Sequence, residues 1–143
     1  MPESSTWLHV RAAGLDLLLA TRDLREVVAP LPVSAIPGGA RGIQGVVMHQ
    51  GEFLPVLAWD DLPGCGSPAG PVTALAVLRP RLGLPIERVV GTLGALPEPW
   101  QVPEDSESAS AWSGGSGLLG DMELRLVDPD RLVALLRRLR ADR

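Results

Sequence analysis

The residues that most often carry out chemistry are few and far apart in this sequence. There are two histidines, His9 and His49, and one cysteine, Cys65, which stands between two glycines. A thiol becomes a nucleophile when a neighbouring base or positive charge activates it, and no histidine lies beside Cys65 in the chain. A zinc site needs about four nitrogen, sulfur or oxygen ligands. We therefore expect an inert loop thiol, and neither a metal nor a cofactor.

The remaining candidates for chemistry have simpler structural explanations. His9 alternates within an apolar stretch and is predicted to be an exposed strand residue. His49 stands at a predicted hairpin tip, where it is either merely exposed or touches a partner. Adjacent carboxylates in a turn point apart, so Asp60–Asp61 is better explained by helix capping than by an acid pair. The glycine-rich run 114–117 is not followed by a lysine in the spacing of a phosphate-binding loop. The sequence thus predicts a protein that is not an enzyme.

Composition and charge point to one globular domain in a reducing compartment. The chain has 143 residues, of which 45% are hydrophobic and 21% are charged, and its net charge is −4. An acidic balance argues against binding to nucleic acid. No apolar run approaches the ~20 residues that span a bilayer, and Met1–Thr6 does not resemble a signal peptide. We expect a cytoplasmic protein with no direct membrane insertion.

Pairs of apolar runs separated by turn residues predict β-hairpins, and single apolar runs bounded by Pro or Gly predict further strands. Residues 97–117, which precede the final hairpin, are rich in Pro and Ser and include Trp100 and Trp112. These two tryptophans either anchor a partner or fold back onto the domain, and the sequence leaves both open. We expect hairpins over 7–20, 42–59 and 118–127, and strands over 24–28, 72–78 and 84–90, the last of which 92–96 extends or restarts. A flexible loop is expected over 97–117.

The C-terminus predicts one helix. Asp128 can cap its first turn, and Pro129 occupies a position where a missing N–H costs nothing. An apolar stripe follows at helical spacing, formed by Leu132, Leu135, Leu136 and Leu139. The whole is a mainly β protein of roughly eight to ten short strands, and periodicity alone does not distinguish a barrel from a sandwich.

Motifs along almost the whole chain resemble, in order, those of CheW-like domains. Leu24–Val27 is similar to the family's V-x-E-V/I element, and Gly45–Val56 to its G-V/I-x-N-L-R-G-x-x-x-P-V/I stretch. Gly83–Val90 is similar to the strand G-x-x-V-D-x-V, and Gly117–Leu136 to the terminal stretch that leads into a helix. No single motif is decisive, but their order and spacing together are fairly specific.

This resemblance implies a fold and a role. The fold is a single CheW-like domain over 1–143, with its core over 6–140, built of two small five-stranded β-barrel subdomains that divide near 65–71, and a short C-terminal helix. The role is a non-enzymatic adaptor that couples chemoreceptors to a CheA-type histidine kinase. The implied partners are the kinase's regulatory domain, the cytoplasmic tip of the receptors and other CheW-like domains, which would recruit the protein to membrane receptor arrays.

The resemblance also implies which residues bind the partners. We expect Glu26 to be the most direct, because a charged residue within an apolar strand needs solvent or a partner. Gln50 stands where the family has an arginine, and an amide only partly replaces a guanidinium. A diverged module without kinase coupling, acting as a scaffold or regulator in another motility or developmental pathway, therefore stays open beside the adaptor. The full expected partner-binding set is Leu24, Glu26, Gly45, Val46, Gln50 and Gly51.

Overall fold

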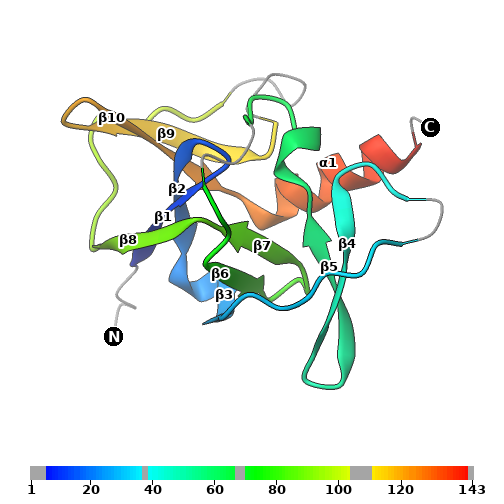
Figure 1. The fold of residues 1–143 in the computed structure, drawn as a ribbon. Helices are drawn as coiled ribbons and strands as arrows, with labels where there is room; N and C mark the ends of the chain where they lie inside the picture. The colour runs from blue at the N-terminus through cyan, green and yellow to red at the C-terminus, as the bar shows by residue number, and fades with distance from the viewer. Residues whose placement is uncertain (1–5, 37–38, 67–69, 104–110, 142–143) are drawn as a thin grey trace.

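The computed structural model describes residues 6–36, 39–66, 70–103 and 111–141 (Figure 1). Short strands and one α-helix, which follows the last strand, form the regular structure of these residues. Two single 3-10 turns, Thr21–Asp23 and Trp59–Asp61, each follow a strand. The strands are β1 Trp7–Ala12, β2 Leu15–Ala20, β3 Leu24–Val28, β4 Ile43–His49, β5 Glu52–Leu57, β6 Ala74–Leu78, β7 Gly83–Ile86, β8 Arg88–Leu93, β9 Ser113–Leu119 and β10 Met122–Val127, and the helix is α1 Pro129–Ala141.

The strands form two five-stranded sheets, which we call sheet A and sheet B. Sheet A has the order β8-β1-β2-β10-β9, and sheet B has the order β3-β6-β7-β5-β4. Neighbours are antiparallel except for β2 with β10 and β5 with β7, which are parallel. The prediction of a mainly β fold with two five-stranded units and a C-terminal helix is confirmed.

The chain changes sheets after β2 and again at Glu87. We expected a strand over 84–90 that 92–96 extends or restarts, but the break comes earlier, because β7 belongs to sheet B and β8 to sheet A. Glu87 donates its backbone N–H to Arg11 O at 2.9 Å, so pairing with sheet A begins there. We also expected the subdomains to divide near 65–71, yet β5 before this segment and β6 after it share sheet B.

One hydrophobic core joins the two sheets and the helix. Leu17 and Leu19 enter it from sheet A, Leu84 and Ile86 enter from sheet B, and Leu132 enters from α1. A smaller cluster within sheet B contains Val47, Leu54, Val56, Leu75 and Val77. Because the main core spans both sheets, the two units stabilise each other rather than folding around separate interiors.

Helix α1 begins and packs as its sequence predicts. Asp128 Oδ1 accepts hydrogen bonds from the backbone N–H groups of Asp130 at 3.0 Å and Arg131 at 3.4 Å. Leu132, Leu135 and Leu139 of the stripe are buried. Within the described part of the chain, no helix is both long enough and apolar enough to cross a bilayer.

The expected loop over 97–117 is wrong for its last part, which forms β9. Trp112 is fully buried and donates its indole N–H to Pro63 O at 2.9 Å. Trp100 lies against Gly115 and Gly117, where an added Cβ would overlap its ring. Both tryptophans therefore fold back onto the domain, and the glycines of β9 are what allow Trp100 to approach the strand. Residues 104–110 of the expected loop lie outside the described residues.

Candidate functional site

A tight turn joins β4 to β5 and holds several of the expected partner-binding residues. His49 pairs with Glu52, so Gln50 and Gly51 form a two-residue loop. Both have positive φ, 52° at Gln50 and 79° at Gly51, as a type I′ turn requires. A glycine suits this conformation, whereas glutamine adopts it at some cost. The turn projects Gln50 into solvent at the end of the hairpin.

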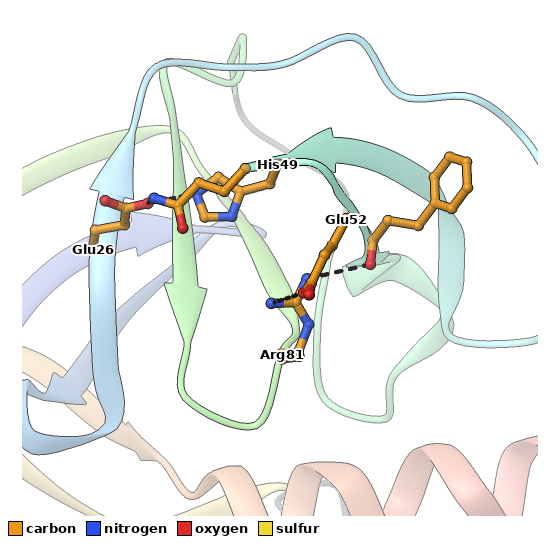
Figure 2. Close-up of polar contacts among 6 residues, drawn as sticks. Glu26, His49, Glu52 and Arg81 are labelled. Carbon is orange, nitrogen blue, oxygen red and sulfur yellow. Dashed lines mark hydrogen bonds and ion pairs between the residues drawn. The ribbon is translucent and has the colours of Figure 1, made fainter.

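Glu26 on β3 meets this turn through its side chain (Figure 2). Its Oε1 lies 2.5 Å from His49 Nε2 and accepts a hydrogen bond from Gln50 Nε2 at 3.2 Å. His49 is 7% exposed, while the Glu26 side chain is 37% exposed. We expected His49 to be exposed at the hairpin tip, and this is wrong. Residues 45, 47 and 49 all face inward along β4, so strand alternation buries the imidazole.

The Glu26–His49 contact uses one of the two ring nitrogens of His49. A carboxylate oxygen accepts hydrogen bonds, so Nε2 is the nitrogen that donates to Glu26. His49 Nδ1 is buried and has no hydrogen-bond partner among the described residues. The His49 ring therefore depends on Glu26 for its one side-chain hydrogen bond in the part of the chain that the structure describes.

These contacts join the two edges of sheet B. β3 and β4 are its outermost strands, yet Glu26 and His49 bond directly. After β3, Ser34 also exchanges two backbone hydrogen bonds with Val46 of β4, at 2.8 and 2.9 Å. The sheet is thus curled until its edges meet, with side chains and one short bridge in place of a full ladder between β3 and β4.

The other expected site residues play different parts. Gly45 is buried, and an added Cβ would overlap Ser34 O, so this position needs glycine for packing. Val46 is half-buried and carries the bridge to Ser34. Leu24 is half-buried against the main core, apart from the turn. Of the six expected residues, the structure brings together Glu26 and Gln50, with Gly51 beside them in the turn.

Two exposed apolar side chains lie next to this turn, and sequence reasoning missed them. Met48 and Phe53 pair directly across β4 and β5 and are 55% and 69% exposed. Arg81 supports this hairpin by pairing with Glu52 at 2.9 Å (Figure 2). The signal was present in the sequence: a two-residue turn centred on 50–51 places residues 48 and 53 opposite each other, on the face away from buried His49.

A second apolar hairpin end lies on sheet A. Leu118, Leu119 and Met122 at the β9–β10 turn are all exposed, and Leu119 pairs with Met122. We call this set the β9–β10 tip, and we call Met48 with Phe53 the β4–β5 tip. The two hairpins point toward opposite ends of the molecule (Figure 1). Large apolar side chains exposed in clusters usually mark interaction surfaces.

The other candidates for chemistry have structural roles. His9 is buried, which corrects the expectation of an exposed residue. Its Nε2 lies 2.9 Å from Asp16 Oδ1, and Arg11 donates to Asp16 Oδ2 at 2.7 Å. All three residues come from the β1–β2 hairpin. Because Arg11 occupies the second carboxylate oxygen, this cluster ties the two strands together.

Asp61 and Cys65 also serve the fold. Asp61 does not cap a helix as expected; its Oδ2 accepts the backbone N–H of Gly42 at 2.9 Å. Burial raises the pKa of the Cys65 thiol to about 12, against a smaller opposing effect of Arg125. A thiol with such a pKa is protonated at neutral pH and is a poor nucleophile. Among the described residues, no three His, Cys, Asp or Glu side chains are grouped so that they could hold a metal ion.

Comparison with known proteins agrees with this fold. The family model of the CheW-like domain matches residues 6–137. The crystal structure of the scaffolding protein TtCheW from Thermoanaerobacter tengcongensis superposes with a TM-score of 0.75 at 17% sequence identity, covering 90% of this chain and 86% of that chain. No curated protein matches the chain. With a family match over nearly its whole length, this chain belongs to the CheW-like domain family.

Proposed function

We propose that this protein is a non-enzymatic adaptor of a bacterial chemosensory system, which couples chemoreceptors to a CheA-type histidine kinase. The observation that carries the proposal is the pair of exposed apolar hairpin tips, one on each sheet, at opposite ends of the molecule. An adaptor must hold two partners at once, and two separated apolar surfaces on one rigid body meet that need. Membership of the CheW-like family supports the same role.

The β4–β5 tip is the better candidate for the kinase's regulatory domain. Phe53 and Met48 offer an aromatic and a flexible thioether side chain side by side, and such residues are enriched at interfaces. The opposite face of the hairpin is polar: Glu26 contacts His49 and Gln50 there, and Glu52, which pairs with His49 across the strands, forms an ion pair with Arg81. Exposed aromatic and Met side chains that lie together are typical of the buried centre of an interface. The receptor tip or a second CheW-like domain would then use other faces, including the β9–β10 tip.

The experiment is calorimetry with the regulatory domain of the kinase from the same organism. We expect Phe53→Asp to weaken binding at least about tenfold, because buried aromatic anchors dominate interface energies. Val72→Asp is the matched control, since Val72 is also an exposed apolar residue but lies before β6, outside both tips. Absence of binding by the unmodified protein at about 50 μM would refute kinase coupling.

A second role has one observation in its favour. The Gln50 amide already donates to Glu26, so the position that carries an arginine in the family offers a partner no positive charge. A module of this kind could serve as a scaffold or regulator in another motility or developmental pathway. Binding of receptor tips or CheW-like domains without binding of the kinase would select this alternative. In either role we place the protein in the cytoplasm, where receptor contacts would recruit it to membrane arrays.

A further inference from the structure

A groove with an apolar floor lies between helix α1 and the β4–β5 hairpin. Two adjoining hollows, of about 230 and 410 Å³, share Ala40, Ile43, Pro55 and Arg140 in their walls. Because they share these walls, they form one continuous groove. It is remote in sequence from the β9–β10 tip and lies at the base of the β4–β5 hairpin rather than at its turn.

The floor of the groove is built by close packing of the helix on β4. Leu136 of α1 lies where a side chain at Gly42 would be, and Gly42 has φ 89°. Ile43 and Pro55 come from the two strands, and Val133 and Leu136 come from the helix. All four are only partly buried, so apolar surface remains open to a ligand.

The rim of the groove is strongly basic. Arg41, Arg81, Arg137 and Arg140 all line it. Arg81 forms an ion pair with Glu52 at 2.9 Å, whereas the other three form none with any carboxylate in the described part of the chain. The whole protein has a net charge of −4, so a group of four arginines around one hollow is a local positive patch on an acidic protein. We call these four arginines and the apolar floor the arginine groove.

We propose that the arginine groove binds an acidic amphipathic helix of a partner protein. Such a helix lays its apolar side chains into a groove while its charged flanks pair with the rim. Guanidinium groups bind carboxylates through two parallel hydrogen bonds, which makes arginine the best rim residue for this purpose. No aromatic side chain of the described residues lines the groove, so it lacks the stacking surface on which the bases of a nucleic acid would bind. The proposal does not rest on the adaptor role, since it follows from the charge and shape of this groove alone.

The test is fluorescence anisotropy with a labelled synthetic peptide about 18 residues long. Its leucines follow helical spacing i, i+3, i+4, i+7, and glutamates flank this stripe. We expect saturable binding at tens of micromolar, weakened about tenfold or more by Arg41→Glu and by Arg140→Glu. Arg41 lies outside the helix, so its effect cannot come from loss of helix stability. Arg88→Glu on exposed β8 of sheet A is the matched control and should change binding less than about twofold.

Three further measurements decide between outcomes. Binding should fall as salt rises from about 0.05 to about 0.5 M, because exposed ion pairs are screened. A scrambled peptide of the same composition should bind at least about tenfold more weakly, because it lacks the apolar stripe. Equal binding of the scrambled peptide, equal loss in Arg88→Glu, or no saturation by about 1 mM would overturn the proposal. Groove-dependent binding to phosphatidylglycerol vesicles without peptide binding would overturn it in favour of a membrane surface.

Discussion

The Glu26 carboxylate on β3 accepts a hydrogen bond from His49 on β4 at 2.5 Å, across the two outer edges of sheet B. This contact gives Glu26 an internal partner. The sequence had suggested Glu26 as a residue free to bind other proteins, and its exposed fraction still allows one oxygen to do so. Its first role in the folded molecule, however, is to satisfy a buried histidine and to hold the curled sheet closed.

Removing that carboxylate should therefore destabilise the protein. In Glu26→Ala, His49 would keep two buried ring nitrogens without partners, and a buried donor left unpaired costs about 1–3 kcal/mol. Urea unfolding followed by circular dichroism measures this loss. Glu98→Gln, at an exposed position, is the control and should lie within about 0.5 kcal/mol of the unmodified protein. A Glu26→Ala variant as stable as this control would contradict a structural role for the pair.

Gln50→Arg should restore a positive charge at the end of the β4–β5 turn. The guanidinium would stand beside Glu26, where the amide now donates at 3.2 Å. Because the pair is exposed, we expect the free energy of unfolding to change by less than about 1 kcal/mol. Under the adaptor role, affinity for the kinase regulatory domain should rise, mainly through faster association. Calorimetry and stopped-flow mixing measure both quantities, and weaker binding by Gln50→Arg would count against this face as the kinase contact.

Substitutions at two neighbouring glycines should distinguish the cost of backbone strain from the cost of overpacking. Gly42 and Gly39 both have positive φ, 89° and 60°, but only Gly42 faces Leu136 of the helix; nothing lies within 4 Å of an added Cβ at Gly39. Gly39→Ala should cost about 1 kcal/mol from strain alone. Gly42→Ala should cost about 2–4 kcal/mol, because strain and overpacking against α1 add. Thermal unfolding of the two variants checks the difference, and equal losses would mean that the helix does not pack against Gly42.

The Cys65 thiol should react slowly with disulfide reagents in the folded protein. With a pKa of about 12, only about 1 in 10,000 molecules carries a thiolate at pH 8. Reaction with an aromatic disulfide, followed by absorbance, should be at least about 100-fold slower than for the urea-unfolded chain, where the ordinary pKa is restored. Equal rates in the folded and unfolded chains would show that burial does not protect the thiol.

The same pKa shift predicts how stability depends on alkaline pH. Burial raises the folded pKa of Cys65 above the ordinary value of 9.0, so the thiol is neutral in both states below about pH 8 and contributes no pH dependence there. As pH rises past 9.0, the unfolded chain loses the proton first, and stability falls by up to about 1.4 kcal/mol per pH unit. Cys65→Ala should remove this part of the slope between about pH 9 and pH 11.

The sequence by itself determined the features that depend on near neighbours in the chain. Turn residues with accessible positive φ located the hairpins, as at Gly51, and Asp128 with Pro129 located the start of the helix. The order of short motifs also identified the CheW-like fold. These signals are local, because a backbone conformation or a cap involves only a few consecutive residues.

Only the tertiary structure decided which polar residues are buried and which apolar residues are left exposed. His49 needs Glu26, which lies 23 positions earlier, and His9 needs Asp16 on the facing strand. Residues 84–96 divide between two sheets because β7 pairs with β6, whereas β8 pairs with β1. The arginine groove likewise exists only because α1 folds back beside β4 and β5. Such features depend on contacts between residues far apart in the chain. Strand alternation and charge suggest whether a side chain is buried or exposed, but they do not identify its partner.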